Sequence, residues 1–340
     1  MIRFVLGTRP EAIKLLPVIR ALKDRGVDFD VIGTGQHAEL LDGTGIRLTQ
    51  NLAIPSQNDP EAYVVAASQA LQRCTWNKVK VVVVQGDTAS AVAGAEAGAA
   101  LGIPVAHVEA GLRSRDFSDP WPEEGYRVRI DALATHRYCP TPRNLANVAS
   151  EGLSGEVTGN TITDALRQMG VHRDPDGGSI VLVTLHRRES FGEPLHNVIR
   201  GLAAAAHHHP HTPFCWPVHP NPKVLEAIRA VAVPPNVLMR GPMPYRDFLT
   251  FLSSAKAVLT DSGGVVEEAC TLGIPAVVAR NATERPEAVE VGNAQLVGTK
   301  ASAVWEGLDW ALETQSQPSA VFGDGHAADR IADHLRSVSK

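Results

Sequence analysis

The sequence has few cysteines, and they are not arranged as in a zinc site or a disulfide framework. Its 340 residues contain four, Cys74, Cys139, Cys215 and Cys270, which lie far apart and form no C-x-x-C pair. Small disulfide-rich domains and zinc knuckles depend on closely spaced cysteines. We therefore interpret the four as small core residues.

Long apolar runs and blocks of basic residues are also missing. No run reaches the ~18 apolar residues that would suggest a membrane span, and the N-terminus enters a strand pattern without a signal-peptide layout. The 32 basic and 37 acidic side chains give a net charge of -5 without a basic cluster. We expect a cytoplasmic protein with a small-molecule partner, and neither a nucleic acid nor a membrane as partner.

One run of histidines raises the question of a metal site. His207 to His209, Pro210 and His211 close an alanine-rich helical stretch just before a proline. Structural sites usually combine spaced ligands, whereas positive charge suits a helix C-terminus. We interpret the run as a solvated helix end, with metal binding as the alternative, and expect neither a metal nor another cofactor.

Hydrophobic runs alternate with longer helical patterns along the whole chain, which is typical of βαβ units around parallel sheets. The length favours two domains. We predict two doubly wound, Rossmann-like α/β domains over residues 1–170 and 171–322, with a polar Gly- and Pro-rich linker at 170–179. A final helix over 324–338, capped by Asp324, lies in a segment 323–340 that we expect to pack back on the first domain. Strands are predicted at 2–6, 27–32, 79–84, 103–108, 180–184, 214–218, 237–240, 257–260 and 276–279.

Ligands of such folds lie at the carboxyl ends of the strands, so the residues that follow the strands are the candidates. After the first strand come Gly7 and a helix start with Arg9 and Lys14, whose charges would suit a phosphate or sugar oxygen. An ordinary turn with surface cations is the alternative. Acidic residues follow later strands: Asp87, Glu109 and the pair Glu123 and Glu124.

Carboxylates directly after buried strands are costly unless they are hydrogen-bonded or used in acid–base chemistry. Helix capping or fixing of a loop is the alternative for Asp87 and Glu109. A first-turn acid favoured by the helix dipole is the alternative for Glu123 and Glu124, and we expect one of the two to be only that.

The second half has two similar signals. His219 follows a strand and lies between prolines, although a structural histidine is the alternative. The segment from Thr260 to Ala269 is typical of a strand, a turn at Gly263 and Gly264, and a helix, which would let a diphosphate approach backbone N–H groups. Glu268, one turn into that helix, could bind the two hydroxyls of a ribose.

These segments together resemble the UDP-N-acetylglucosamine 2-epimerase family, whose fold is of the glycosyltransferase-B type. The resemblance covers essentially the whole chain. It rests on ordered motifs that begin at Gly7, Thr34, Gly86, His107, Pro120, Gly159, His186, Pro217, Asp261 and Thr283.

The resemblance implies a non-hydrolysing epimerase that interconverts UDP-N-acetylglucosamine and UDP-N-acetylmannosamine by eliminating and re-adding UDP, in a homodimer whose active site lies in the interdomain cleft. It implies that Asp87, Glu109, Glu123 and His219 are catalytic. It implies that the diphosphate is bound by Arg9, His219, Ser262, Gly263 and Gly264, the ribose by Glu268 and the uracil by Phe248. Lys14 and Arg285 would also bind the substrate. Alternatives are a hydrolysing relative that releases N-acetylmannosamine and UDP, a glycosyltransferase of this fold, and a non-enzymatic sugar-nucleotide sensor.

The chain also departs from the family pattern. Tyr126 stands where the family has asparagine beside the catalytic glutamates, and Glu39 replaces a glutamine of the family's second, regulatory nucleotide-sugar site. That site would use Gln36, His37, His186 and Arg187. Because an anion at Glu39 opposes a diphosphate, we expect turnover that does not require a second nucleotide sugar.

Overall fold

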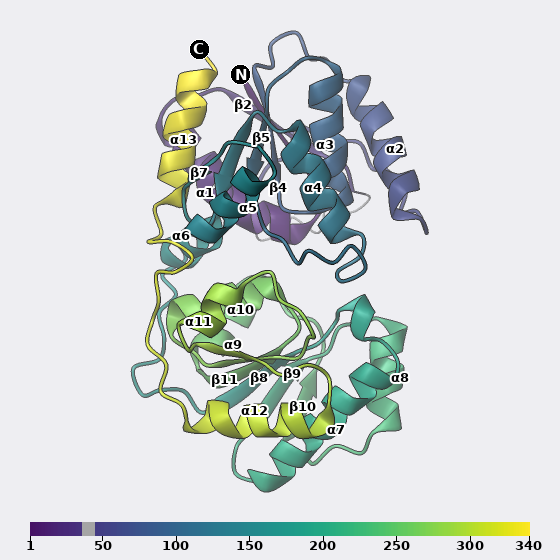
Figure 1. The fold of residues 1–340 in the computed structure, drawn as a ribbon, viewed down its shortest axis with the longest axis vertical. Coiled ribbons are helices and arrows are strands. Elements are labelled where there is room, and N and C mark those ends of the chain that lie inside the picture. The colour runs from purple at the N-terminus through teal and green to yellow at the C-terminus, as the bar shows by residue number, and fades with distance from the viewer. Residues whose placement is uncertain (36–44) are drawn as a thin grey trace. The chain divides into compact units, whose positions relative to one another are not determined.

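The computed structural model describes residues 1–35 and 45–340, and the chain divides into two compact units (Figure 1). The first unit is Met1–Gln168 together with Gly323–Lys340, and the second is Met169–Phe322. Within the described residues, no helix is both long and apolar enough to cross a membrane.

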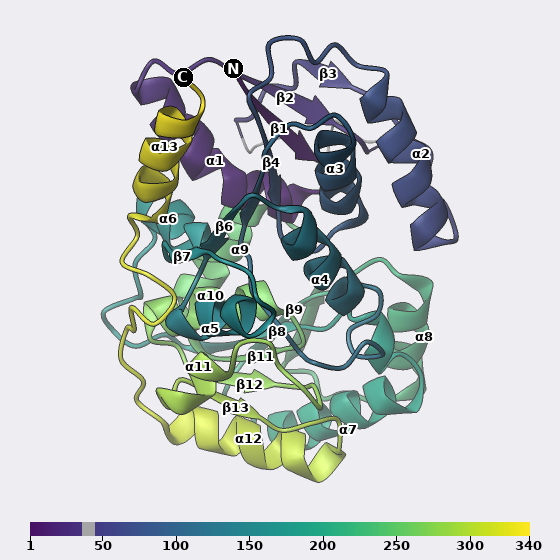
Figure 2. The same cartoon turned by 45° about the horizontal axis from the view of Figure 1, so that its top comes forward.

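The first unit contains a seven-stranded parallel sheet in the order β3-β2-β1-β4-β5-β6-β7. Its strands are β1 (Ile2–Leu6), β2 (Phe29–Gly33), β3 (Gln50–Asn51), β4 (Val81–Gln85), β5 (Val105–Val108), β6 (His136–Cys139) and β7 (Glu156–Val157). Its helices are α1 (Arg9–Asp24), α2 (Pro60–Gln72), α3 (Ala89–Ala100), α4 (Glu123–Leu133), α5 (Pro142–Ser150), α6 (Thr161–Gln168) and α13 (Ala327–Val338). Figure 2 shows α1 and α13 on one face of this sheet, and α2, α3 and α4 on the other.

The valine run of β4 shows why this sheet is buried on both faces. Val81 and Val83 pack in the core that α1 and α13 share with the sheet. Val82 and Val84 pack instead against α2, α3 and α4. Successive strand side chains point to opposite faces, so a strand between two helical layers needs an unbroken apolar run.

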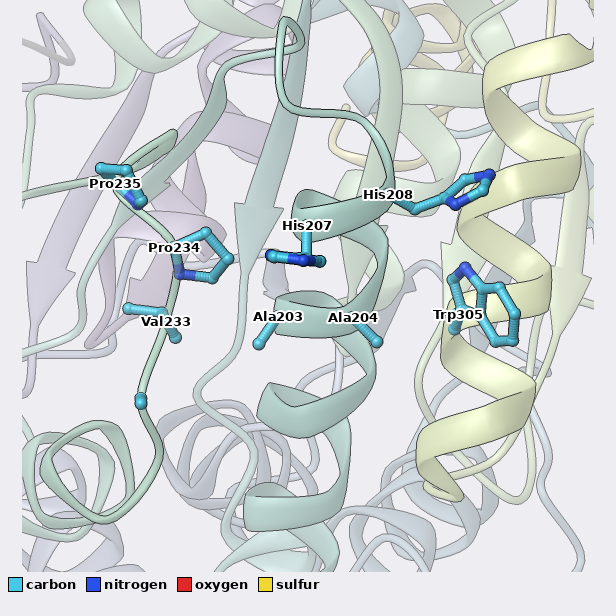
Figure 3. A pocket seen from close by; sticks show the side chains of 9 residues that line it. Ala203, Ala204, His207, His208, Val233, Pro234, Pro235 and Trp305 are labelled. Atoms are coloured by element: carbon cyan, nitrogen blue, oxygen red, sulfur yellow. The ribbon is translucent and has the colours of Figure 1, made fainter.

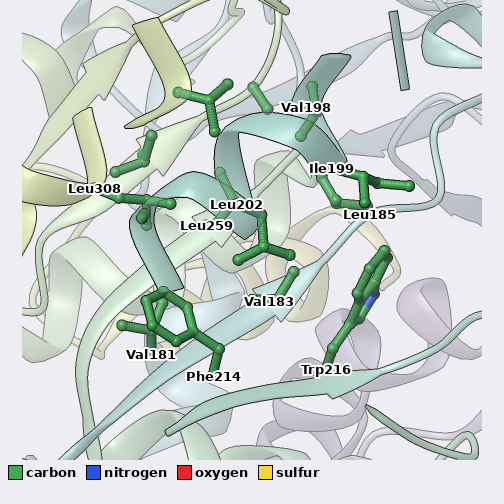
Figure 4. Packing of buried hydrophobic residues seen from close by; sticks show 14 of the residues in the cluster. Val181, Val183, Leu185, Val198, Ile199, Leu202, Phe214, Trp216, Leu259 and Leu308 are labelled. Carbon is green, nitrogen blue, oxygen red and sulfur yellow. The ribbon is translucent and has the colours of Figure 1, made fainter. Parts of the chain in front are cut away.

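The second unit repeats this architecture with six parallel strands in the order β10-β9-β8-β11-β12-β13. They are β8 (Ile180–Thr184), β9 (Phe214–Pro217), β10 (Val237–Arg240), β11 (Ala255–Thr260), β12 (Ala276–Val278) and β13 (Ala294–Leu296). The helices are η2 (Arg188–Ser190), α7 (Glu193–His208), α8 (Pro222–Ala230), α9 (Tyr245–Ser253), α10 (Gly263–Leu272), α11 (Pro286–Glu290) and α12 (Ala301–Glu313). Leu202 of α7, Leu308 of α12 and Trp216 of β9 belong to its main core (Figure 4).

The prediction of doubly wound α/β architecture is confirmed, with differences at the ends of elements. The last helix begins at Ala327, not at residue 324, and Asp324 does not cap it. Asp324 instead pairs with Arg330 at 2.6 Å. The backbone N–H groups of Ala327 and Ala328 donate to the Asp164 carboxylate at 3.2 and 2.9 Å. The helix that returns to the first unit is thus held at its start by a residue distant in sequence.

Candidate active site

In each sheet the strand order reverses once, between β1 and β4 in the first unit and between β8 and β11 in the second. Crevices outside the carboxyl ends of parallel strands at such a point are the usual ligand sites of open α/β sheets. Gly7 follows β1, Asp87 lies two residues after β4, and Glu109 directly follows β5. The sheet thus brings the predicted carboxylates to one edge.

Glu109 is held in an unusual backbone conformation. Its φ of 72° lies in the left-handed region, which a non-glycine residue seldom adopts. The carbonyl of Tyr138 on β6 accepts hydrogen bonds from the N–H groups of Glu109 at 3.1 Å and Ala110 at 3.0 Å. Two hydrogen bonds to one carbonyl therefore hold the left-handed turn at the end of β5.

Three donors from three segments contact the Glu109 carboxylate. The Lys14 ammonium of α1 lies 2.5 Å from Oε1, and the Asn160 amide donates to the same oxygen at 3.1 Å. The Gln85 amide, at the end of β4, donates to Oε2. Donors of this kind favour the ionised carboxylate. The arrangement therefore fits a fixed negative charge better than a group that exchanges protons.

Asp87 belongs to a second ion-pair cluster. Arg127 of α4 donates to its Oδ2 through Nε at 2.8 Å, and Nη2 lies 2.7 Å from the same oxygen. The side chain of Asp87 is 28% exposed, whereas that of Arg127 is 2% exposed. Capping is not the role of Asp87, because Thr88 caps α3 by accepting from the N–H of Ala91 at 3.0 Å.

The two consecutive glutamates at the start of α4 differ in their environment. Glu124 is buried, lies 3.0 Å from Nη1 of Arg127, and accepts from the N–H groups of Ser114 and Arg115, each at 2.9 Å. These contacts of Glu124 hold the preceding loop against α4, which is a structural role. Glu123 is half-buried and lies one helical turn before Arg127, on the helix face that reaches Asp87.

The turn after β1 is also fixed by a buried carboxylate. Glu11 accepts from the N–H groups of Gly7 at 3.0 Å and Thr8 at 2.7 Å, and from the Thr88 hydroxyl at 2.7 Å. Burial raises the pKa of Glu11 despite these hydrogen bonds. The contact joins the turn that carries half-buried Arg9 to the residue after Asp87.

In the second unit, Asp261 organises the residues after β8 and β11. Its Oδ2 accepts from the N–H groups of His186 and Arg187, each at 2.8 Å. The predicted regulatory residues Gln36, His37 and Glu39 lie outside the described part of the chain. Of that predicted set, the structure therefore places His186 and Arg187, on a loop held by Asp261 just before the predicted diphosphate-binding turn.

His219 is exposed after β9, and its ring stacks with that of His186 at a centroid distance of 5.9 Å. Partial burial and the neighbouring His186 lower the pKa of His219. Nδ1 of His219 accepts from the N–H of Asn221 at 3.2 Å, so in the neutral ring the proton is on Nε2. This tautomer presents an N–H donor that suits a phosphate oxygen.

The glycines at the start of α10 have different surroundings. A Cβ at Gly263 would lie 2.2 Å from Nη1 of Arg285, whereas a Cβ at Gly264 would meet nothing within 4 Å. Ser262 is the residue before the helix, whose first N–H groups lack partners within it. Gly264 therefore borders open space beside a helix N-terminus, the arrangement predicted for diphosphate binding.

Arg285 takes part in a buried ion-pair network rather than projecting from this turn. It donates to Glu267 at 2.6 Å and to Glu284 at 3.2 Å, and Arg280 pairs with Glu284 at 2.9 Å. The side chain of Arg285 is only 7% exposed. Its observed contacts support the α10 start, and its role toward the substrate stays a prediction.

The predicted ribose and uracil residues lie near a tyrosine. Tyr245 donates from its hydroxyl to Oε1 of Glu268 at 2.5 Å, and its ring stacks with Phe248 at a centroid distance of 6.4 Å. Burial and the Glu268 charge raise the pKa of Tyr245 far above its usual value, so the hydroxyl keeps its proton. Glu268 and Phe248 thus share one neighbour.

Sequence reasoning missed the partners of the carboxylates. Asn160 lies within a recognised motif and Gln85 and Arg127 lie next to such motifs, but none of the three received a role. Gln85 offered a signal, because it is a polar residue that ends a run of four valines. Arg127 offered another, because it lies one turn from Glu123 on a predicted helix. Tyr245 offered none that separates it from an ordinary helix residue.

Comparison with known proteins identifies the family. A family model described as UDP-N-acetylglucosamine 2-epimerase matches residues 20–336. The UDP-N-acetylglucosamine 2-epimerase of Escherichia coli strain K12 is 36% identical over 373 residues, which cover 98% of this chain and 97% of that protein. The chain belongs to the UDP-N-acetylglucosamine 2-epimerase family, a family of enzymes.

Solved structures agree with this assignment. The UDP-GlcNAc 2-epimerase of Neisseria meningitidis bound to UDP-GlcNAc is 32% identical, with a TM-score of 0.91 and coverage of 99% of both chains. The S. aureus MnaA structure with UDP is 31% identical, with a TM-score of 0.89, and covers 98% of this chain and 95% of that one. A glycosyltransferase of kitacinnamycin, 17% identical with a TM-score of 0.61, shares the fold, which is of the glycosyltransferase-B type.

Proposed function

We propose that this epimerase interconverts UDP-N-acetylglucosamine and UDP-N-acetylmannosamine by inverting C2 of the sugar, without net hydrolysis. The observation that carries the proposal is the pair of carboxylate clusters after β4 and β5: Glu109 with its three donors, and Asp87 with Arg127. The family and a relative bound to UDP-GlcNAc support the choice of substrate.

The chemistry needs carboxylates with different tasks. The C2 proton of the sugar is not acidic, so its removal requires departure of UDP and positive charge at C1. In the elimination, the C1–O bond breaks with its electron pair going to the diphosphate, a base takes the C2 proton, and a C1=C2 double bond forms. Re-addition reverses these steps, with a proton delivered to the opposite face of C2.

We assign the charge-stabilising task to Glu109, because its donors keep it an anion whichever way the reaction runs. A fixed negative charge near C1 stabilises the oxocarbenium character of both half-reactions. Asp87 and Glu123 are then the groups that take up and deliver the C2 proton. Asp87 suits this task because one of its oxygens is held by Arg127 and its side chain remains partly exposed.

The nucleotide is bound by the second unit in this proposal. N–H groups at Ser262, Gly263 and Gly264 and the Nε2–H of His219 would hold the diphosphate, while Glu268 and Phe248 would contact ribose and uracil. In the first unit Arg9 adds a positive charge, whereas Lys14 acts on the substrate through Glu109. Hydrogen bonds and charges at the diphosphate stabilise the leaving group and retain it for re-addition.

Incubation with UDP-N-acetylglucosamine in deuterated water tests the proposal. We expect deuterium at C2 of both nucleotide sugars by mass spectrometry, and the phosphorus spectrum should show the diphosphate diester retained. Asp87→Asn, Glu109→Gln and Glu123→Gln should each lower turnover about 100-fold or more while still binding UDP. Accumulation of free UDP and N-acetylmannosamine would instead identify a hydrolysing enzyme, and UDP binding without deuterium exchange would refute catalysis at C2.

A further inference from the structure

A cluster of three metal-ligating side chains lies where the end of α7 meets α12. It consists of His208 and His209 from α7 and its cap, and Asp309 from α12. One nitrogen or oxygen atom from each lies within 4.8 Å of the others. Within the described chain, none of the three belongs to the carboxylate clusters or to the turn at the start of α10.

Two consecutive histidines can converge here because the helix ends between them. Neighbouring residues within a helix point about 100° apart, but His209 has left the helical conformation, with φ of −112° and ψ of 66°. Its ring lies 5.0 Å from that of His208, centroid to centroid. Figure 3 shows His208 turned toward Trp305 of α12, whereas His207 points to the other side, toward Pro234.

The backbone around His209 is firmly held. Its carbonyl accepts hydrogen bonds from the Asn236 side chain at 3.1 Å and from the N–H of Thr212 at 3.0 Å. Nε2 of His209 lies 2.9 Å from Oδ1 of Asp309. An imidazole on a hydrogen-bonded backbone and a carboxylate are thus already in contact, and exposed His208 can adjust its side-chain torsions toward them.

We propose that His208, His209 and Asp309 form a binding site for a divalent transition-metal ion of the zinc type. Two imidazoles and one carboxylate are ligands that zinc accepts, at about 2.0–2.2 Å from the metal, with water in a fourth position. The site also lies at the C-terminus of a sixteen-residue helix, whose exposed carbonyls favour positive charge. A bound ion would tie α7 to α12.

Calorimetric titration of zinc into tag-free, chelator-stripped protein tests the proposal. We expect one ion per chain, with the affinity of His208→Ala and Asp309→Asn lowered at least ~10-fold, since loss even of an outer partner weakens metal sites that much. His211→Ala is the matched control, because His211 belongs to the same histidine run but not to the cluster. It should bind zinc as the parent does.

The thermal unfolding temperature gives a second readout. Zinc should raise it in the parent and in His211→Ala, but not in Asp309→Asn, because only a folded cluster joins residues from α7 and α12. Absence of saturable binding at about 0.1 mM zinc would overturn the proposal. Parent-like binding by Asp309→Asn would also overturn it, since the histidine run alone would then be the chelator.

Discussion

Replacing Arg127 with lysine should slow turnover while the fold and UDP binding are retained. The guanidinium reaches Asp87 through Nε and Nη2 and Glu124 through Nη1, and the compact ammonium of lysine cannot reproduce this planar fork. Loss of one charge-assisted hydrogen bond at Asp87 corresponds to about 1.5–3 kcal/mol. If the loss raises the activation free energy by that amount, because Asp87 is less well positioned for proton transfer, kcat falls roughly 10- to 100-fold with little change in KM.

Steady-state kinetics with both nucleotide sugars measure this effect, and Arg129→Lys is the control. Arg129 lies on the same helix but pairs with Glu61 and Glu96 and is 38% exposed, so its replacement should leave kcat unchanged. A parent-like kcat for Arg127→Lys would refute the positioning role. An equal loss in both variants would show that α4 as a whole had been disturbed.

Three further predictions concern other parts of the chain. Gly264→Ala should weaken UDP binding at least ~10-fold in calorimetry without lowering the unfolding temperature, because the new methyl group would contact a bound diphosphate but no protein atom within 4 Å. Gly263→Ala cannot test this, since its Cβ would collide with Arg285. Asp164→Ala should lower the free energy of unfolding of the first unit by about 1–2 kcal/mol in urea titrations, because it removes the cap of α13. Burial lowers the pKa of His136, so the unfolded state takes up a proton before the folded state does, and the free energy of unfolding should fall as pH drops below about 6.5. His136→Gln should make the free energy of unfolding depend less steeply on pH in this range. An unchanged dependence would contradict the attribution to His136.

The fold was predictable where hydrophobic pattern and length agree. The run from Val81 to Val84 can only be a strand covered on both faces, and the structure places it in the middle of the sheet. β3, β6, β7 and β13 were missed. β7 has just two residues, both exposed, and β6 reads His-Arg-Tyr-Cys, so neither has the apolar pattern from which strands are recognised.

The candidate site was predictable as a set of positions but not as a set of contacts. Functional residues of open α/β sheets lie just after the carboxyl ends of the strands, and this rule selects Asp87 and Glu109 because parallel strands end at a common edge. It cannot reveal that Lys14 contacts a residue 95 positions away, since that pairing depends on how α1 packs across the sheet. The role of Lys14 toward the substrate stays a prediction, and the structure adds its contact with the Glu109 carboxylate.

The contacts change how the carboxylates are interpreted. From the sequence, Asp87, Glu109 and Glu123 are three equivalent acidic residues, and any of them could exchange a proton. The structure makes them unequal: Glu109 accepts from donors of α1, of β4 and of the residue before α6, whereas Asp87 pairs with Arg127 and is partly exposed. The proposed reaction passes through positive charge at C1 in both directions, and an anion that keeps its charge meets its main electrostatic requirement. Among the described carboxylates after β4 and β5, the arrangement around Glu109 meets that requirement better than the one around Asp87.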